Sequence, residues 1–405
     1  MTQQYDVCII GGGFCGLILS HALRTIGFRC LLLEQRASLA RPTDHRALVL
    51  SYGSGLILDQ LGLWSQSLPR YPLKELTFSM RGRLGDLKLT TDAYQVPWLG
   101  QVVNAGEWFS ECMQTSQLSD CWCDVTLKKI SHENNGTLLT LQHNSKTKSI
   151  LSDLVIGADG TDSWLSQQMK WPVTSSLAAH QAMVVPVQKV ACGAWLRVAP
   201  VGTLAFIPHS EHHGVLIWTA TESNMARLRN QKTFDRLTRQ MAGHVFHKAT
   251  WQFEHKQCFP VKAQLCQPSN VPGVICLGNA LHTLPPVSAQ GFNLGIRDCA
   301  MLIEHMVSWR QQHKTFQSAE FSAKFFQSRE EDTRRTMRMS LAALKAAHWA
   351  KPWPLLSSLG LCAFSGLEPF YRSYVHQALG IGTPYQYFMK VDAMQHLLKK
   401  SESFL

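Results

Sequence analysis

The segment at residues 5–36, YDVCIIGGGFCGLILSHALRTIGFRCLLLEQR, constrains the fold more than any other part of the chain. An uninterrupted apolar run at residues 7–10 is typical of a parallel strand that is buried on both faces. A helical pattern of apolar residues follows, Gly27 is placed to end that helix, and residues 28–33 predict a second strand. The segment therefore predicts a β-α-β unit and an α/β fold with a parallel sheet.

Three glycines, Gly11, Gly13 and Gly16, form a GxGxxG pattern between the first strand and the helix. Glycines here let backbone N–H groups approach a pyrophosphate at the helix N-terminus, where the helix dipole favours negative charge. Glu34 closes the second strand, and its carboxylate could accept hydrogen bonds from an adenosine ribose. An ordinary glycine-rich turn is the alternative. Because the first strand, the helix, the second strand and the terminal acid are all in register, we expect an adenine dinucleotide. Glu34 favours FAD or NAD over NADP.

Two later turns favour FAD over NAD. Residues 154–165, LVIGADGTDSWL, again predict a buried strand, which ends at Asp159 and Gly160, although a plain capped turn is the alternative. A third short apolar strand ends at Gly278 and Asn279, and a stiff, uncharged turn with two adjacent prolines then leads into a helix. Three nucleotide-facing turns exceed what NAD requires, whereas the ribityl chain and ring of FAD need additional contacts.

Composition restricts the partners. The 405 residues carry a formal net charge of +11, which suits an anionic ligand or surface such as a phosphate-rich cofactor or acidic lipid. Nucleic acid is not expected, because the basic residues are scattered or flanked by acids, as at residues 329–335.

The twelve cysteines include no CxxC pair, so neither a metal site nor a disulfide framework is predicted. With no signal peptide or apolar run of 18 residues, we expect a cytoplasmic protein.

The three turns together resemble those of p-hydroxybenzoate-hydroxylase-type flavoprotein monooxygenases, over about residues 5–310. Within that group, DHRALVLS at residues 44–51, LGQVV at 99–103 and the stretch at 278–298 are similar to the FAD-dependent hydroxylases of ubiquinone biosynthesis. Asn279, in place of the usual aspartate, is similar to the 2-octaprenyl-6-methoxyphenol hydroxylase branch. Leu281 and Ala289 depart from the smaller residue and the glycine that are usual in the family.

The resemblance implies an aromatic-ring monooxygenase with tightly bound, non-covalent FAD and with NAD(P)H as a transient co-substrate. Reduced flavin would add O2, and the resulting C4a-hydroperoxide would hydroxylate a polyprenylated phenol of the 2-polyprenyl-6-methoxyphenol type in ubiquinone biosynthesis. The cofactor carries the chemistry, and the protein orients the reactants and excludes water. No metal is required.

The resemblance also implies roles for individual residues. Arg46 would lie near the flavin and the nicotinamide nucleotide, Gln101 would contact FAD, and the Pro286 backbone would face the reacting side of the substrate. The structural alternatives are an ion-paired arginine, a strand-end polar residue and a rigid turn. His282 could act as a base, although a lone histidine in a turn is more often a hydrogen-bonding residue. A helix starting near residue 293 would direct its dipole at the flavin ring, and the cofactor contacts expected around it are Gly278, Asn279, Ala289, Gln290, Gly291 and Asn293.

We expect a Rossmann-like FAD-binding domain (residues 1–75, 100–172 and 262–330) interleaved with a mixed β-sheet substrate domain (76–99 and 173–261). A helical C-terminal region (331–405) follows. Trp195, Phe206 and Trp218 of the substrate domain could line a ring-binding pocket, or belong to the core. The basic C-terminal region, with its apolar stretch at 353–364, is consistent with peripheral docking to the anionic inner face of the cytoplasmic membrane, or with a packed helix.

Other ubiquinone-biosynthesis proteins are further candidate partners, and two other functions remain open. One is a flavin hydroxylase or reductase that acts on a different aromatic or isoprenoid substrate. The other is a non-catalytic scaffold of the ubiquinone-biosynthesis complex, since Asn279, Leu281 and Ala289 could mark a chain that no longer turns over.

Overall fold

The computed structural model describes residues 3–40, 44–65, 67–81, 86–116, 118, 120–177, 179–188, 193–243, 249–349 and 375–381. Its first sheet has seven strands in the order β8-β2-β1-β11-β10-β9, with β20 also pairing with β11. The strands are β1 (Gln3–Ile10), β2 (Cys30–Leu33), β8 (Cys121–Trp122), β9 (Val125–Glu133), β10 (Gly136–His143), β11 (Lys146–Gly157) and β20 (Val274–Cys276). Strands β8, β2, β1, β11 and β20 run parallel, whereas β9 and β10 are antiparallel.

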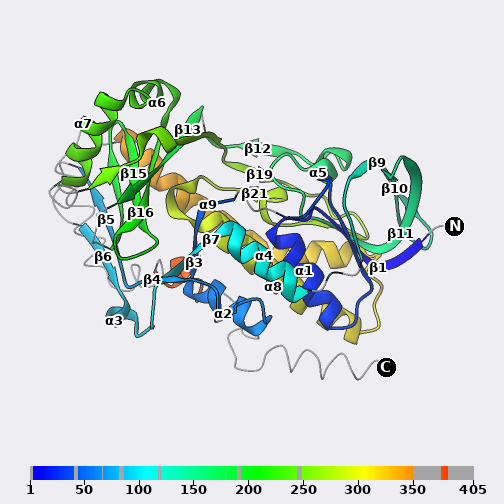
Figure 1. Cartoon of the computed structure of the whole chain (residues 1–405). Helices are drawn as coiled ribbons and strands as arrows, with labels where there is room; N and C mark the ends of the chain where they lie inside the picture. Colours follow the sequence, from blue (N-terminus) through cyan, green and yellow to red (C-terminus); the bar gives the residue numbers. More distant parts are fainter. Residues whose placement is uncertain are drawn as a thin grey trace.

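Long helices cover one face of this sheet: α1 (Phe14–Thr25), α4 (Ala105–Ser116), α8 (Gln290–Gln311) and α9 (Ala319–Trp349). Helix α1 contacts α4 and α8, and α8 contacts α9 (Figure 1). The predicted β-α-β unit is confirmed: Gly27 has a φ of +88° just after α1, and the Phe28 N–H bonds the Leu23 carbonyl at 2.9 Å. This backbone reversal feeds the chain directly into β2.

The second sheet has eight strands and lies at the other end of the molecule (Figure 1). The order is β17-β13-β16-β15-β14-β5-β6, and β18 pairs with β13. The strands are β5 (Glu75–Met80), β6 (Asp86–Thr90), β13 (His180–Gln188), β14 (Ala194–Ala199), β15 (Gly202–Pro208), β16 (His213–Thr221), β17 (Thr250–Trp251) and β18 (Gln257–Val261). Helices α6 (Glu222–Leu228) and α7 (Gln231–Ala242) pack against this sheet.

Three aromatic residues of the second sheet, Trp195, Phe206 and Trp218, lie in or against a core cluster that includes residues of α6 and α7. Phe206 and Trp218 are buried in that cluster, and Trp195 packs against it. The Trp218 indole also donates a hydrogen bond to Thr238 of α7 at 3.1 Å. The structure therefore corrects the ring-pocket interpretation of these aromatics and supports the core alternative.

Two small sheets and several short helices connect the large sheets. One small sheet contains β3 (Ala47–Ser51), β7 (Gly100–Asn104) and β4 (Tyr71–Leu73), and the other contains β12 (Val173–Ser175), β19 (Gln264–Cys266) and β21 (His282–Thr283). The remaining elements are α2 (Tyr52–Gln60), α3 (Thr91–Tyr94), α5 (Trp164–Gln168), η2 (Phe253–His255), η3 (Gly278–Ala280), η4 (Pro286–Ser288) and a helical turn at 375–379.

The predicted α/β architecture with a flavin-type nucleotide domain, a second sheet and later helices is confirmed. The exact domain boundaries stay predictions. Strands β5, β6 and β13–β18 do form one sheet, and α9 runs through residue 331 without a break. The apolar stretch at 353–364 lies outside the described residues, as do Lys351, Lys399 and Lys400. Within the described ranges, no helix is long and apolar enough to cross a bilayer.

Candidate active site

A cavity of about 490 Å³ opens where β1, β2, β11 and β20 end and α1 and α8 begin. This is the edge of a parallel sheet where α/β proteins bind their ligands. It is lined by the predicted residues Gly11, Gly13, Glu34, Arg46, Asp159, Gly160, Gly278, Asn279 and Gly291. The sequence analysis did not single out other residues of the lining, which include Phe14, Cys15, Arg36, Trp164, Phe292 and Gly295.

The glycines of the first turn are required by close backbone approaches. A Cβ on Gly11 would lie 2.4 Å from the Ala158 carbonyl oxygen, and a Cβ on Gly16 would lie 1.9 Å from the Gly11 oxygen. Gly16 is absent from the cavity lining, so its role is to let α1 start close to β1. Gly13 caps α1 without a side chain, which leaves the first turn of the helix accessible from the cavity. Such a helix start is suited to a phosphate group.

Glu34 lies at the end of β2 and is 7% exposed. Its carboxylate accepts hydrogen bonds from the Gly12 N–H at 2.9 Å and from the Arg36 guanidinium at 3.1 Å. Burial raises the pKa of Glu34, but the hydrogen bonds and charge of Arg36, together with the Gly12 N–H, lower it by more. The pKa of Glu34 therefore ends below its usual range. An ionised carboxylate is therefore held at the predicted ribose position.

Asp159 and Gly160 form the second turn. One Asp159 oxygen, Oδ2, accepts the Leu165 N–H at 3.1 Å, whereas Oδ1 is buried and bonds no residue that the structure describes. Burial raises the pKa of this carboxyl, and the hydrogen bonds of Ser163 and Leu165 only partly oppose that shift. A buried acceptor without a partner is costly, so the turn is suited to a ligand that donates a hydrogen bond. Gly160, with a φ of +88°, leaves open space beside it.

The third turn is held by Asp298 of α8. Its Oδ2 accepts the Gly278 N–H at 2.9 Å and lies 2.6 Å from Nε2 of His282. Both side chains are fully buried, and His282 is absent from the cavity lining. This position favours the hydrogen-bonding alternative for His282, and its predicted role as a base gains no support from the geometry.

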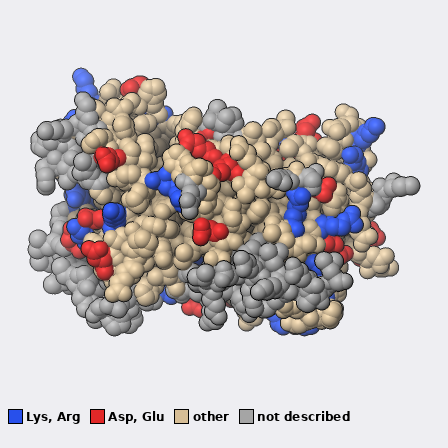
Figure 2. Space-filling model, turned by 60° about the horizontal axis from the view of Figure 1, so that its bottom comes forward, with Lys and Arg blue, Asp and Glu red and all other residues tan. Residues whose placement is uncertain are grey.

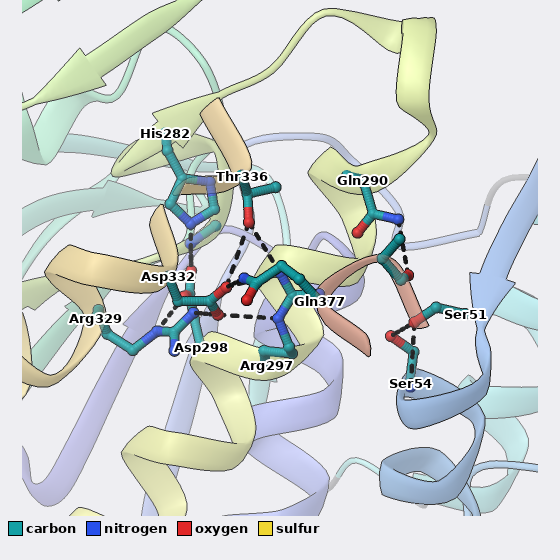
Figure 3. Close-up of polar contacts among 12 residues, drawn as sticks. Ser51, Ser54, His282, Gln290, Arg297, Asp298, Arg329, Asp332, Thr336 and Gln377 are labelled. Carbon is teal, nitrogen blue, oxygen red and sulfur yellow. Dashed lines mark hydrogen bonds and ion pairs between the residues drawn. The ribbon is translucent and has the colours of Figure 1, made fainter. Parts of the chain in front are cut away.

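A buried ionic network continues from Asp298 into α9 (Figure 3). Arg329 donates to Asp298 at 2.7 Å and to Asp332 at 2.6 Å, and Arg297 donates to Asp332 at 2.9 Å. Burial raises the pKa of Asp298, but His282 and Arg329 lower it more strongly, so the pKa ends below its usual range. The network holds α8 in place against α9. Because Asp298 of α8 binds the Gly278 N–H, the network also holds the Gly278 turn.

Several residues predicted to touch the cofactor hold the start of α8, and their contacts with the cofactor stay predictions. The Asn293 amide accepts the Ser51 N–H at 2.8 Å and donates to the carbonyls of Val49 and Ala289. Gln290 donates to the Ala378 carbonyl at 3.1 Å. Ala289 caps α8 with a φ of +51°, the left-handed conformation that explains why glycine is usual there. None of the three lines the cavity, whereas their neighbours Gly291 and Phe292 do.

The three remaining predicted residues have different surroundings. Arg46 lines the cavity and forms a two-bond ion pair with Asp44 at 2.7 Å, which raises its pKa. Gln101 lies on β7 with a buried Oε1 that bonds none of the described residues. Pro286 is half-buried in η4, which contacts α9 and β16. Neither Gln101 nor Pro286 lines the cavity, and their roles stay predictions.

The groups that line or surround the cavity fit FAD. It offers an ionised acid at the end of β2, a glycine-capped helix start, an unsatisfied buried carboxylate oxygen, and glycines where a long ligand must pass close to the backbone. No group of three or more His, Cys, Asp or Glu in the described part of the chain could hold a metal ion. The fold and this site define a flavoprotein.

Comparisons with known proteins give the family. The chain belongs to the FAD binding domain family, whose profile matches residues 4–313. It is 24% identical to the 3-demethoxyubiquinol 3-hydroxylase of Escherichia coli K12 over 94% of this chain and all of that protein. It is also 24% identical to the mitochondrial ubiquinone biosynthesis monooxygenase COQ6 of Xenopus tropicalis, over 90% and 91% of the two chains.

Among solved structures, the p-nitrophenol 4-monooxygenase PnpA of Pseudomonas putida superposes with a TM-score of 0.74 at 13% identity, over 95% of this chain and all of PnpA. At this identity the likeness shows the fold. The predicted resemblance to the ubiquinone-biosynthesis hydroxylases is confirmed, and the protein is an FAD-dependent monooxygenase with NAD(P)H as co-substrate.

Sequence reasoning missed Asp298, Arg329 and Asp332 as determinants of the site. Arg329 and Asp332 are spaced one helical turn apart, which is a recognisable ion-pair signal. Taken as sequence alone, residues 329–335 show only basic residues flanked by acids. Asp298, the other partner of Arg329, lies 31 residues before it, and no local pattern joins these two residues.

Proposed function

We propose that the protein hydroxylates the ring of a polyprenylated phenol, of the 2-polyprenyl-6-methoxyphenol type, in ubiquinone biosynthesis. Two relatives that match nearly the whole chain are named for a ubiquinone precursor and for ubiquinone biosynthesis, which supports this pathway. When bound, FAD supplies the oxygen-activating chemistry through the C4a-hydroperoxide that the resemblance implies. The chain's own residues bind and orient FAD and keep the reaction away from water.

One observation supports an apolar substrate. Strand β3, which directly follows the cavity residue Arg46 in the chain, contributes to an aliphatic layer between the small sheet β3-β7-β4 and the second large sheet. Val102 and Ile207 are buried in that layer, and Val49, Val215 and Ile217 are half-buried around them, although none of these five lines the cavity. An aliphatic surface of this kind is suited to an isoprenoid-bearing ring rather than to a charged soluble aromatic. This layer is the observation that carries the proposal.

The first test is the visible spectrum of the purified protein, followed by aerobic addition of NADPH. We expect bound-flavin bands that bleach and then recover as O2 reoxidises the cofactor. Protein without flavin, before and after incubation with FAD, would instead favour the scaffold function. The spectrum is therefore read before any substrate is chosen.

The substrate is tested by product analysis with a prenylated methoxyphenol in detergent and with p-hydroxybenzoate as the soluble comparison. We expect the prenylated ring to gain one oxygen atom while p-hydroxybenzoate is returned unchanged. Hydroxylation of the soluble phenol alone would replace the proposal with the second enzyme function, a hydroxylase of a different aromatic compound. Mass spectrometry of both reactions distinguishes these outcomes.

We also propose that the protein docks peripherally on the anionic inner face of the cytoplasmic membrane, where a polyprenyl tail resides. Arg334, Arg338 and Lys345 are exposed on α9, and the chain has an excess of positive charge. On the face in Figure 2, basic side chains form separate groups with acidic ones nearby. Such a surface favours a weak, salt-dependent contact rather than a tight one.

A further inference from the structure

A short segment near the end of the chain, residues 375–381, packs against both halves of the site. It forms a helical turn at 375–379 that ends at Gly380, which has a φ of +73°. In Figure 1 this is the short red helix beside β3 and α2. No motif in the sequence points to this segment, although its Ala378 carbonyl accepts the hydrogen bond of Gln290 in α8.

Two buried glutamines join the segment to the cofactor side. Gln377, 3% exposed, donates a hydrogen bond to Oδ1 of Asp332, the carboxylate that also binds Arg297 and Arg329. Gln290 reaches the segment from the first turn of α8 and donates to the Ala378 carbonyl (Figure 3). Two adjacent residues in the middle of the segment are thus tied to α9 and to the start of α8.

A glycine contact fixes the segment against the turn after β3. A Cβ on Gly53 of α2 would lie 2.3 Å from the Gly380 carbonyl oxygen, so the two backbones approach closely only because position 53 is glycine. A Cβ on Gly380 would in turn lie 3.2 Å from the Ser51 hydroxyl. Ser51 is the residue whose N–H binds Asn293. The segment therefore contacts the same turn that holds α8.

The apolar side of the segment faces the second sheet. Val375 and Leu379 are buried in one cluster with Leu89 of β6 and Leu99, and Leu76 of β5 packs against that cluster. Strands β5 and β6 form the edge of the second sheet. Residues 375–381 therefore bridge the edge of the substrate sheet to the start of α8, whose Gly291, Phe292 and Gly295 line the cofactor cavity.

We propose that residues 375–381 are a brace that positions the start of α8 for FAD, and that Gln377 is its principal positioning residue. The inference rests on the FAD-binding part of the proposed function and is independent of the substrate. Without the brace, the start of α8 would adopt other arrangements in the apoprotein. FAD would then bind only the fraction that remains correctly arranged, and its apparent dissociation constant would rise by the inverse of that fraction.

The test is Gln377→Leu in the full-length protein, which removes the amide donor and leaves Asp332 with its two arginines. We expect the FAD dissociation constant to rise about tenfold, as for a binding-competent fraction of about one tenth. Amide hydrogen exchange in the first turns of α8 should become faster in the apoprotein. Gln312→Leu is the matched control, because Gln312 is exposed at the far end of α8. It should change neither measurement.

A second variant covers the case in which Gln377→Leu does not fold. Leu379→Ala loosens the apolar side of the brace and leaves the buried ion pairs intact, and it should shift both measurements in the same direction. A folded variant of either kind with unchanged FAD affinity and unchanged exchange in α8 would overturn the inference. Failure of the wild-type protein to hydroxylate a prenylated phenol would overturn the substrate proposal and leave the brace standing.

Discussion

Single residues of the cofactor motifs divide into those that line the cavity and those that shape its surroundings. Glu34 and Asp159 line the cavity, and the buried Oδ1 of Asp159 bonds no residue that the structure describes, which is costly without a ligand partner. Asn293 uses its amide on Ser51, Val49 and Ala289. The sequence identified all three positions because the motifs are local. It could not separate the two roles, because a motif does not state where a side chain points.

Ala289 offers a test at this scale, because it holds a left-handed backbone with an L side chain. We expect Ala289→Gly to raise the free energy of unfolding by about 1 kcal/mol, since the left-handed conformation costs an L-residue about that much. Urea denaturation of the apoprotein measures the change. Ala300→Gly, in the buried interior of α8, should lower stability instead. A loss of stability in Ala289→Gly would show that the turn is not strained.

At the scale of elements, α8 is the part of the molecule on which the site depends. Its start closes the cavity, and Asp298 in its middle holds the Gly278 turn and pairs with α9. The helices and strands around it follow from local patterns, which is why the β-α-β unit and the three turns could be predicted. Which helix would pair with α8 could not, because Asp298–Arg329 and Arg297–Asp332 join residues far apart in the sequence. The burial of Trp218 in the core could not be predicted for the same reason. Alternation along a strand does not say which face of the sheet the helices cover.

We expect Asp298→Asn to lower the free energy of unfolding by about 3–5 kcal/mol at neutral pH, because it leaves His282 and Arg329 buried without their shared carboxylate. Burial raises the pKa of Asp298, but His282 and Arg329 lower it more, so its folded pKa is below the unfolded one. Its stabilisation is therefore present above the unfolded pKa, about 4, and is lost as pH falls through the folded value.

The gap between wild type and Asp298→Asn should accordingly narrow in acid, which urea titrations at neutral pH and near pH 3 would measure. Asp162→Asn is the matched control, because Asp162 forms an exposed ion pair with Lys262. That variant should cost less than about 1 kcal/mol. An equal gap at both pH values would show that Asp298 does not stabilise the fold through its charge.

For the whole molecule, the small sheet β3-β7-β4 and the second large sheet meet along an aliphatic layer, and the brace at residues 375–381 closes one side of that junction. The sequence predicted two units but not how they join, because the joining contacts come from β3, β4, β14–β16 and a segment near the end of the chain. The proposed polyprenyl substrate would reach these units from a bilayer if the protein docks there. The proposed docking depends on the surface of the whole chain, and the charge of that surface is the quantity to test.

We expect the full-length protein to float with vesicles that contain phosphatidylglycerol at low salt and to remain unbound with phosphatidylcholine vesicles. Its excess positive charge is attracted to the anionic surface at about 1 kcal/mol per basic residue near the lipid. Added salt near 1 M should release it, because the screening length then falls to about 3 Å. Arg338→Glu with Lys345→Glu should weaken flotation if α9 faces the lipid, and the exposed Lys128→Glu on β9 is the control. Absence of binding to anionic vesicles at low salt would exclude electrostatic docking, and the substrate would then have to be delivered by a carrier or partner protein.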